Sequence, residues 1–340
     1  MFKRILSKYL LFWLILFCLL GTSWKMIFGP DAFDPFTLNG NQMAALISLT
    51  MLAVGSLLPF DEVVGVAKNW PKVVGGTFVQ YVSMPLLAFC VAKIFNLQGG
   101  YFVGVMIAGC VPGAMASNVL TLTARGNVSY SVGLTTSATL LSPLVVPATL
   151  WFFFKEKSFN IDFIKMMQNL LLTVVVPVVA GFTLSRLFKW WQKCSEMFAE
   201  IIANIVIIWI ITSVVASNSG KIVELTAAPL CAIVILNVMG YLAGFFGGTA
   251  LGITPAMRRA LTIEVGMQNA GLGTTLAKIY FEELPDAQLM CAVYTFECMA
   301  TGVILAQFFR FVTERAEKKS AQTVSAATDE GKELSLKKSE

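Results

Sequence analysis

One carboxylate, Glu264, stands within an apolar stretch and is followed by residues that weaken a helix. It lies in the run Thr262-Ile263-Glu264-Val265-Gly266-Met267-Gln268-Asn269-Ala270-Gly271. An acidic side chain at bilayer depth costs roughly 2.5–3.5 kcal/mol on insertion scales, so it generally faces a partner charge, an ion or water. The glycines and amides after Glu264 predict a helix that opens and frees backbone carbonyl oxygens. The run therefore indicates an ion or substrate site.

A second predicted break lies in the run Val111-Pro112-Gly113-Ala114-Met115-Ala116-Ser117-Asn118. Pro112 lacks the N–H of a helical hydrogen bond, and Gly113 relaxes the backbone. Ser117 and Asn118 then place side-chain oxygens beside the opened turn. A proline in a membrane helix is often only a kink, so it is the pairing with the run at Glu264 that indicates a site.

Other oxygen-bearing side chains lie within apolar stretches. Ser131 and Thr135 are four residues apart, as are Glu264 and Gln268, so each pair shares one helix face. Gln80 adds an amide. Hydroxyls in a membrane helix most often bond to their own backbone carbonyls. The whole set nevertheless offers carboxylate, amide, hydroxyl and carbonyl oxygens, the ligands that hard cations such as sodium prefer.

The composition places these residues in a membrane. Of the 340 residues, 56% are hydrophobic and only 13% are charged, whereas a soluble domain has about 25% charged residues. The chain contains no histidine, which excludes histidine-based catalysis and proton relays. Its seven cysteines form no CxxC pair and are expected to be small packing residues. We therefore expect an all-α polytopic membrane protein.

Apolar windows of about 20 residues predict ten transmembrane helices. They run at about 9–28, 41–60, 73–95, 100–124, 128–154, 163–188, 198–217, 226–250, 257–280 and 286–310. The first is too long for a cleaved signal peptide and lacks its small-residue exit. No Arg- and Ser-rich transit peptide precedes it, which favours the inner membrane of a bacterium.

The loop charges assign the two sides of the membrane. If the spans alternate, one side receives all the arginines: Arg4, Arg125, Arg186, Arg258, Arg259, Arg310 and Arg315. The opposite loops hold Asp31, Asp34, Glu224, Glu282, Glu283 and Asp286. The positive-inside rule then makes both termini cytoplasmic. An odd number of spans would scatter the arginines over both sides.

The two halves of the chain are predicted to be inverted repeats. Asn118 and Asn269 are separated by about the same number of residues as the starts of the first and sixth spans. Five spans per half make the second half enter from the opposite side, so the fourth and ninth spans are counterparts. Residues 313–340, rich in Lys, Glu, Ser and Ala, are expected to form a disordered cytoplasmic tail after the membrane domain of residues 1–312.

The motifs resemble those of the bile acid:sodium symporter family. One stretch runs from Ala116-Ser117-Asn118 through Ala124-Arg125-Gly126-Asn127 to Ser131, Thr135, Ser142-Pro143 and Pro147, and another from Leu261 to Leu272. Gln80-Tyr81-Val82-Ser83-Met84-Pro85 and Asn237-Val238-Met239-Gly240-Tyr241 match as well. The resemblance covers about residues 9–310, and it implies ten helices in two inverted five-helix repeats. Spans one, two, six and seven would form a panel domain, the others a core in which the unwound fourth and ninth spans cross.

The resemblance also implies two sodium sites and a substrate site. One sodium ion would meet Ser117, Asn118, Ser131, Thr135 and Glu264. The second would meet Gln80, Glu264, Val265, Met267 and Gln268, partly through backbone carbonyls. An organic anion would lie near the crossing, against Asn118, Asn269 and the N-terminal ends of the half-helices, whose dipoles favour carboxylates.

One departure from the family concerns the tenth span. Where some bacterial relatives have a Trp-His-Asn stretch near the substrate, this chain has Glu297-Cys298-Met299. A second buried acid is expected to alter substrate choice or to add a protonation site, so Glu297 joins the predicted substrate-binding residues. It weakens the case for a bile acid and favours a smaller anion, such as pantoate or a keto acid.

The sequence therefore predicts a sodium-coupled symporter that imports an organic anion by alternating access. Its partners are the anion, sodium ions and the bilayer, without nucleic acid or an obligate protein partner. A proton-coupled transporter that uses Glu264 and Glu297 is the alternative. An intramembrane enzyme is disfavoured because no paired catalytic acids, metal cluster or nucleophile–base set is present. A sodium-sensing receptor is disfavoured by the short soluble tail.

The predicted topology places Lys221 outside the cell. Lys221→Cys, in a chain whose native cysteines are replaced, should react with a membrane-impermeant maleimide added to intact cells. Arg258→Cys in the same background is the control and should react only after the membrane is opened. Labelling of Lys221→Cys from the cytoplasmic side alone would contradict the ten-span topology.

Overall fold

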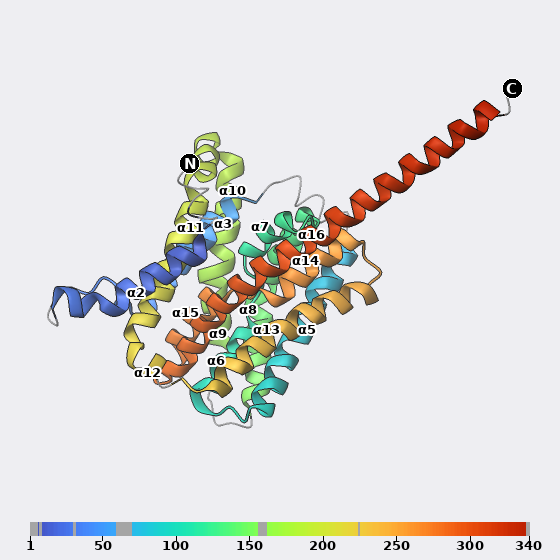
Figure 1. Ribbon diagram of the computed structural model, residues 1–340. Coiled ribbons are helices and arrows are strands. Elements are labelled where there is room, and N and C mark those ends of the chain that lie inside the picture. The colour runs from blue at the N-terminus through green and yellow to red at the C-terminus, as the bar shows by residue number, and fades with distance from the viewer. Residues whose placement is uncertain are drawn as a thin grey trace.

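The computed structural model describes residues 6, 9–29, 32–58, 70–155, 162–223 and 225–337, with side chains described up to residue 317 except those of 222 and 223. Within these ranges all regular structure is helical, apart from a bridge between two extended residues. The helices are α2 (Leu10–Phe28), α3 (Gly40–Ser56), α5 (Trp70–Ile94), α6 (Gly99–Cys110), α7 (Ala116–Thr123), α8 (Val128–Phe154), α9 (Phe163–Leu170), η1 (Leu171–Val175), α10 (Val176–Leu187), α11 (Lys189–Ser217), α12 (Ser219–Val223), α13 (Ala227–Ala250), α14 (Pro255–Gly266), α15 (Ala270–Tyr280) and α16 (Pro285–Lys337). Figure 1 shows their arrangement as a bundle from which the end of α16 projects.

Seven of the described helical segments are long and apolar enough to cross a membrane. They are α2, α5, α8, the continuous stretch from α9 to α10, α11, α13 and the first part of α16. The chain is therefore a polytopic, all-helical membrane protein, as its composition predicts. The predicted second span corresponds to α3, which has 17 residues. Its expected end at residue 60, like the loop charges Arg4, Asp31 and Glu224, lies outside the described residues.

Two predicted spans are each interrupted, and both predicted breaks are confirmed. The range 100–124 consists of α6 and α7, and the range 257–280 consists of α14 and α15. Pro112 follows Val111, the residue that caps α6, and cannot donate the next helical hydrogen bond. After α14, Met267 is extended, with φ −104° and ψ 94°. The two breaks leave backbone groups in the interior that need other partners.

The predicted sixth span contains a feature that the sequence analysis did not expect. Its helix passes through a short π-helical segment, η1, between α9 and α10. Pro177 follows directly, at the start of α10. Because Pro177 has no N–H to donate, the regular ladder is disturbed here, and a π-bulge absorbs the irregularity without ending the helix.

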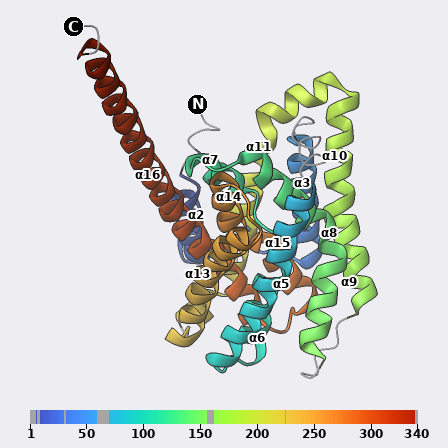
Figure 2. The same cartoon turned by 90° about the vertical axis from the view of Figure 1, so that its right-hand side faces the viewer.

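The helices pack in two groups. In one, α3 lies against α10 and α11, and α2 lies against α11. In the other, α13 lies against α5 and α14, and α16 lies against α6 and α15. Figure 2 shows α10 along one side of the molecule and α13 on the other. The interrupted helices therefore belong to the group built around α5, α13 and α16.

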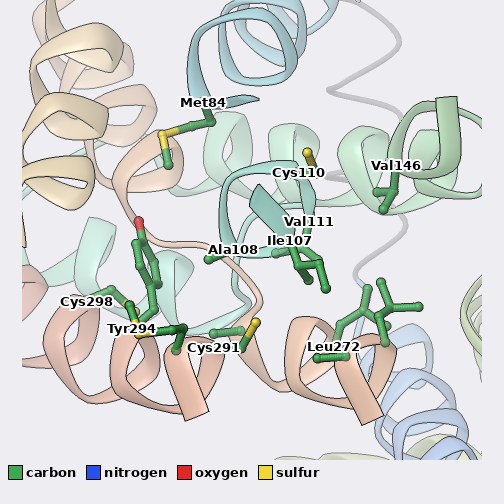
Figure 3. Packing of buried hydrophobic residues seen from close by; sticks show 14 of the residues in the cluster. Met84, Ile107, Ala108, Cys110, Val111, Val146, Leu272, Cys291, Tyr294 and Cys298 are labelled. Carbon is green, nitrogen blue, oxygen red and sulfur yellow. The ribbon is translucent and has the colours of Figure 1, made fainter. Parts of the chain in front are cut away.

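A large apolar cluster fills the interior beside the breaks. Figure 3 shows part of it, with Met84 of α5, Ile107 of α6, Leu272 of α15 and Tyr294 of α16. Four cysteines are buried, as expected for packing residues, namely Cys18, Cys110, Cys291 and Cys298, whereas Cys90, Cys194 and Cys231 are exposed. All seven are free thiols.

The C-terminal region is helical where the sequence analysis expected no regular structure. α16 continues past the predicted span, through the predicted tail, to Lys337. Its Ala, Glu and Lys residues have high helix propensity, and no proline interrupts them. Arg125, which follows α7, pairs with Glu314 and Glu317 at 3.1 and 2.6 Å and so fastens the first exposed turns of α16.

Candidate ion and substrate site

The two interrupted segments pair with each other. Gly113 and Gln268 form an antiparallel bridge. The N–H of Ala114 donates to the Met267 carbonyl at 2.7 Å, and the N–H of Asn269 donates to the Pro112 carbonyl at 2.7 Å. Each break thus satisfies part of the other's backbone, and the pairing places polar groups of α7 and α14 side by side.

Glu264 lies at the centre of this arrangement and is completely buried, with 0% of its surface exposed. Its carboxylate accepts a hydrogen bond from the hydroxyl of Ser117 on α7 and one at 2.7 Å from the hydroxyl of Thr135 on α8. None of the ion pairs in the described part of the chain involves Glu264. A buried carboxylate without a protein cation needs a bound cation or a proton.

The break after α6 passes directly over this carboxylate. A Cβ added to Gly113 would collide with Oε1 of Glu264. Glycine is therefore required there by the close approach of the two segments, not only by the flexibility of the break.

Ser131 lies in the same layer but does not hydrogen-bond Glu264. Its hydroxyl is 3.2 Å from that of Thr121, and its backbone carbonyl accepts from the Thr135 hydroxyl at 3.1 Å. Ser117, Ser131 and Thr135 are all buried. The structure thus brings together three predicted ligands and Glu264, and Thr121 is a hydroxyl that the sequence analysis missed.

The predicted second group of ligands surrounds Gln268. Its amide nitrogen donates to the Val265 carbonyl at 2.7 Å, and its amide oxygen accepts from Gln80 of α5 at 3.4 Å. The Gln80 amide oxygen is buried and has no hydrogen-bond partner among the described residues. The Met267 carbonyl accepts from Ala114. An acceptor oxygen that lacks a donor fits a cation ligand, because it gains no competing hydrogen bond from the protein.

The two predicted substrate-binding asparagines lie at the ends of the breaks. Asn118 has a buried amide oxygen that no donor in the described part of the chain reaches. Asn269 caps α15, since its side chain accepts from the N–H of Leu272 at 3.1 Å. The N-terminus of α15 carries partial positive charge, which favours an anion nearby.

Glu297 is not joined to this group. It lies on α16, and neither of its carboxylate oxygens, both buried, has a hydrogen-bond partner among the described residues. No hydrogen bond of the described residues links it to Glu264 or Asn118. Glu297 is therefore a second carboxylate without a hydrogen-bond partner among the described residues.

Two residues without a role predicted from the sequence hydrogen-bond the ninth-span break, and a third, Thr301, supports one of them. Asn237 and Tyr294 donate to the Gly266 carbonyl at 2.8 and 2.9 Å, and Thr301 donates to Asn237 at 2.9 Å. Asn237 could have been singled out, because an amide in the middle of an apolar span needs a partner just as Gln80 does.

Comparison with known proteins gives independent information on the whole chain. A sequence model described as the Sodium Bile acid symporter family matches residues 44–225. A Bacillus subtilis (strain 168) protein named as the uncharacterized sodium-dependent transporter YocS is 30% identical over 317 residues, which cover 92% of this chain and 94% of that protein.

Plant and human proteins are similar as well. The Arabidopsis thaliana probable sodium/metabolite cotransporter BASS1, chloroplastic, is 32% identical over 298 residues, 88% of this chain and 72% of that protein. The human ileal sodium/bile acid cotransporter is 28% identical over 275 residues, 78% of each chain. The similarity therefore extends over most of the helical bundle.

The contact between Gly113 and Glu264 predicts that Gly113→Ala destabilises the protein. The new methyl group must displace the carboxylate or the segment after α6, and such overpacking costs roughly 1–3 kcal/mol. The midpoint of thermal unfolding, followed by tryptophan fluorescence of the purified protein, should fall. Gly273→Ala is the control, because its Cβ would meet Ile107 and Cys291 at ordinary distances of 3.4 and 3.5 Å. Equal midpoints for the two variants would show that Glu264 is not held against Gly113.

Proposed function

The chain belongs to the sodium bile acid symporter family, and from this premise we propose that it imports a small organic anion together with sodium. The observation that carries the proposal is the burial of Glu264 without a protein cation, among hydroxyl and amide oxygens. The names of the relatives, which describe sodium-dependent transport, support sodium as the coupling ion. The arrangement of oxygens around Glu264 supports this region as its binding site.

The first sodium ion binds among Ser117, Asn118, Ser131, Thr135 and Glu264. The hydroxyls of Ser117 and Thr135 already point at the carboxylate. The amide oxygen of Asn118, which has no donor, supplies a further ligand. A single negative charge with neutral oxygens suits a monovalent hard cation, since the ion replaces the charge partner that the protein lacks.

The second sodium ion binds on the other side of the ninth-span break, among Gln80, Glu264, Val265, Met267 and Gln268. The carbonyls of Val265 and Met267 come from the interrupted backbone. Gln80 bonds Gln268 through its amide nitrogen, and its amide oxygen, which has no hydrogen-bond partner among the described residues, completes the set. Each carbonyl has a second lone pair beyond its present hydrogen bond.

The substrate is a small carboxylate, such as pantoate, a keto acid or a bile acid. It binds near Asn118 and Asn269, where the N-terminus of α15 attracts negative charge. Two sodium ions offset both Glu264 and the anion, so ion and substrate occupancy reinforce each other. Glu297 acts at the edge of this site, where it sets substrate preference.

Transport proceeds by alternating access in a fold of ten spans and two inverted repeats. α2, α3, α9–α10 and α11 form the panel, and the interrupted helices move with the core of α5–α8 and α13–α16. The two packing groups of helices support this division. The protein lies in the bacterial inner membrane with both termini in the cytoplasm, as the arginine distribution indicates.

A proton-coupled transporter is the second candidate. The observation that favours it is Glu297, whose two buried oxygens have no partner among the described residues. A protonated carboxyl group avoids the cost of a buried unpaired charge, so Glu297 together with Glu264 could carry protons.

Glu264→Ala should abolish uptake driven by a sodium gradient, because the variant removes the charge that holds the cation. Proteoliposomes with the purified protein would be assayed for labelled pantoate, pyruvate and taurocholate under separate sodium and proton gradients. Sodium should also stabilise the wild-type protein against heat by mass action, and this stabilisation should be lost in the variant. The exposed Glu283→Ala is the matched control.

Two results would decide against the proposal. Uptake by the wild-type protein under a proton gradient alone would favour proton coupling. Full sodium-induced stabilisation of Glu264→Ala would make Glu264 a packing residue.

Glu297→Gln keeps the shape of the side chain and removes its charge. We expect a changed preference among the three carboxylates, or a changed pH dependence of uptake, with the sodium concentration for half-maximal stabilisation near the wild-type value. Uptake that is unchanged across pH and across the three substrates would exclude a role of Glu297 in transport.

A further inference from the structure

The carbonyl of Gly266 has lost its helical partner. Gly266 is the last residue of α14. In an uninterrupted helix its carbonyl would accept from the N–H of Ala270. That N–H instead donates to the Gln268 carbonyl at 2.8 Å. A buried carbonyl without a donor is costly, so the chain must supply a replacement at this point.

Two side chains from other helices supply it. The amide nitrogen of Asn237, on α13, donates to the Gly266 carbonyl at 2.8 Å, and the hydroxyl of Tyr294, on α16, donates to it at 2.9 Å. Both side chains are completely buried, at 0% exposure. In Figure 3 the Tyr294 ring projects away from α16, and its hydroxyl oxygen faces the side on which Met84 lies.

The orientation of the Asn237 amide is set by the Gly266 carbonyl and supported by Thr301. Because the Gly266 carbonyl can only accept, the NH2 group of Asn237 must face it, and the amide oxygen must face the other way. There the hydroxyl of Thr301 lies at 2.9 Å and can donate to it or to the Glu297 carbonyl of its own helix, also at 2.9 Å. The hydroxyl of Tyr241, 3.1 Å from that of Thr301, can in turn donate to Thr301.

Tyr241 also touches the break directly. A Cβ added to Gly266 would collide with the Tyr241 ring. The aromatic ring therefore lies flush against the backbone that the hydrogen bonds hold. The backbone at Gly266 is confined by Tyr241 and fastened by Asn237 and Tyr294.

The fastened carbonyl lies between the two carbonyls assigned to sodium. Val265 precedes Gly266 and Met267 follows it, and the extended conformation of Met267 turns successive carbonyls to opposite sides. Holding the Gly266 carbonyl toward α13 and α16 therefore acts together with the Ala114 N–H, which donates to the Met267 carbonyl at 2.7 Å, on the direction in which the Met267 carbonyl points.

We propose that Asn237, Tyr294 and Thr301 are positioning residues that hold the broken ninth span in its cation-binding conformation. They touch neither ion nor substrate. They replace the lost helical bond and keep the carbonyls of Val265 and Met267 directed at the second sodium ion. The proposal rests on the proposed sodium coupling. It adds that the affinity for sodium depends on side chains of α13 and α16 that do not bind the ion.

The test compares sodium affinity with intrinsic stability in the purified full-length protein. Thermal unfolding is measured over a sodium chloride series, with choline chloride keeping the ionic strength constant. Thr301→Val should raise the sodium concentration for half-maximal stabilisation about tenfold, because Asn237 is then free to turn away from Gly266. Thr301→Ser retains the hydroxyl and should restore the wild-type value.

Thr295→Val is the matched control. Thr295 lies on the same helix and is buried, whereas Thr301 is half-buried, and among the described residues the Thr295 hydroxyl bonds only to the Cys291 carbonyl of its own helix, at 3.1 Å. The sodium concentration for half-maximal stabilisation of Thr295→Val should equal that of the wild-type protein. Tyr294→Phe, which removes one donor and keeps the ring, gives a second reading if Thr301→Val does not fold, and it should weaken sodium binding in the same direction.

The outcomes separate this proposal from the function it rests on. Wild-type sodium dependence in Thr301→Val and Tyr294→Phe, with loss of that dependence in Glu264→Ala, would overturn the positioning role and leave sodium coupling intact. Absence of sodium stabilisation in the wild-type protein would overturn both. A weakened response in Thr295→Val equal to that in Thr301→Val would also overturn it, since any α16 change would then suffice.

Discussion

The structure depends on one constraint, which is that a fully buried carboxylate must be compensated where the protein provides no cation. Glu264 receives two hydroxyl hydrogen bonds, from Ser117 and Thr135, and no ion pair within the described residues. Hydroxyl donors alone stabilise a charge in a low-dielectric interior only in part. In the proposed function, a bound sodium ion offsets the cost that remains.

The interruption of two helices follows from the same need. In a continuous helix the interior carbonyls accept hydrogen bonds from the helix's own N–H groups. Backbone carbonyls that ligate a cation in the membrane interior must come from a segment where these bonds are broken. The bridge between Gly113 and Gln268 reduces the number of unpaired backbone groups, because each interrupted segment forms backbone hydrogen bonds with the other. What the bridge cannot satisfy at Gly266 is taken up by side chains of α13 and α16. The site thereby becomes dependent on helices that contribute no ligand to it.

The candidate site could be predicted in large part from the sequence. A charged residue in an apolar stretch and a residue that breaks a helix are both recognisable from the residues next to them. Glu264, the two breaks, and the hydroxyls of Ser117 and Thr135 were all identifiable from residue type and spacing. The partners of Asn237 and Tyr294 were not, since they depend on how closely α13 and α16 approach α14. Glu297 was predicted beside the substrate, but helix spacing alone could not show that both its oxygens lack donors. The continuation of α16 to Lys337 was missed because a charged composition was taken to exclude a helix, although its residues favour one.

Equilibrium binding of radioactive sodium to the purified protein tests the central claim most directly. Binding would be measured in detergent without substrate, with choline as the replacing cation, on the wild-type protein and on Glu264→Gln, which keeps the side-chain volume and removes the charge. The account predicts saturable sodium binding to the wild-type protein and none above background to Glu264→Gln. Saturable binding of equal affinity and capacity in both proteins would contradict it.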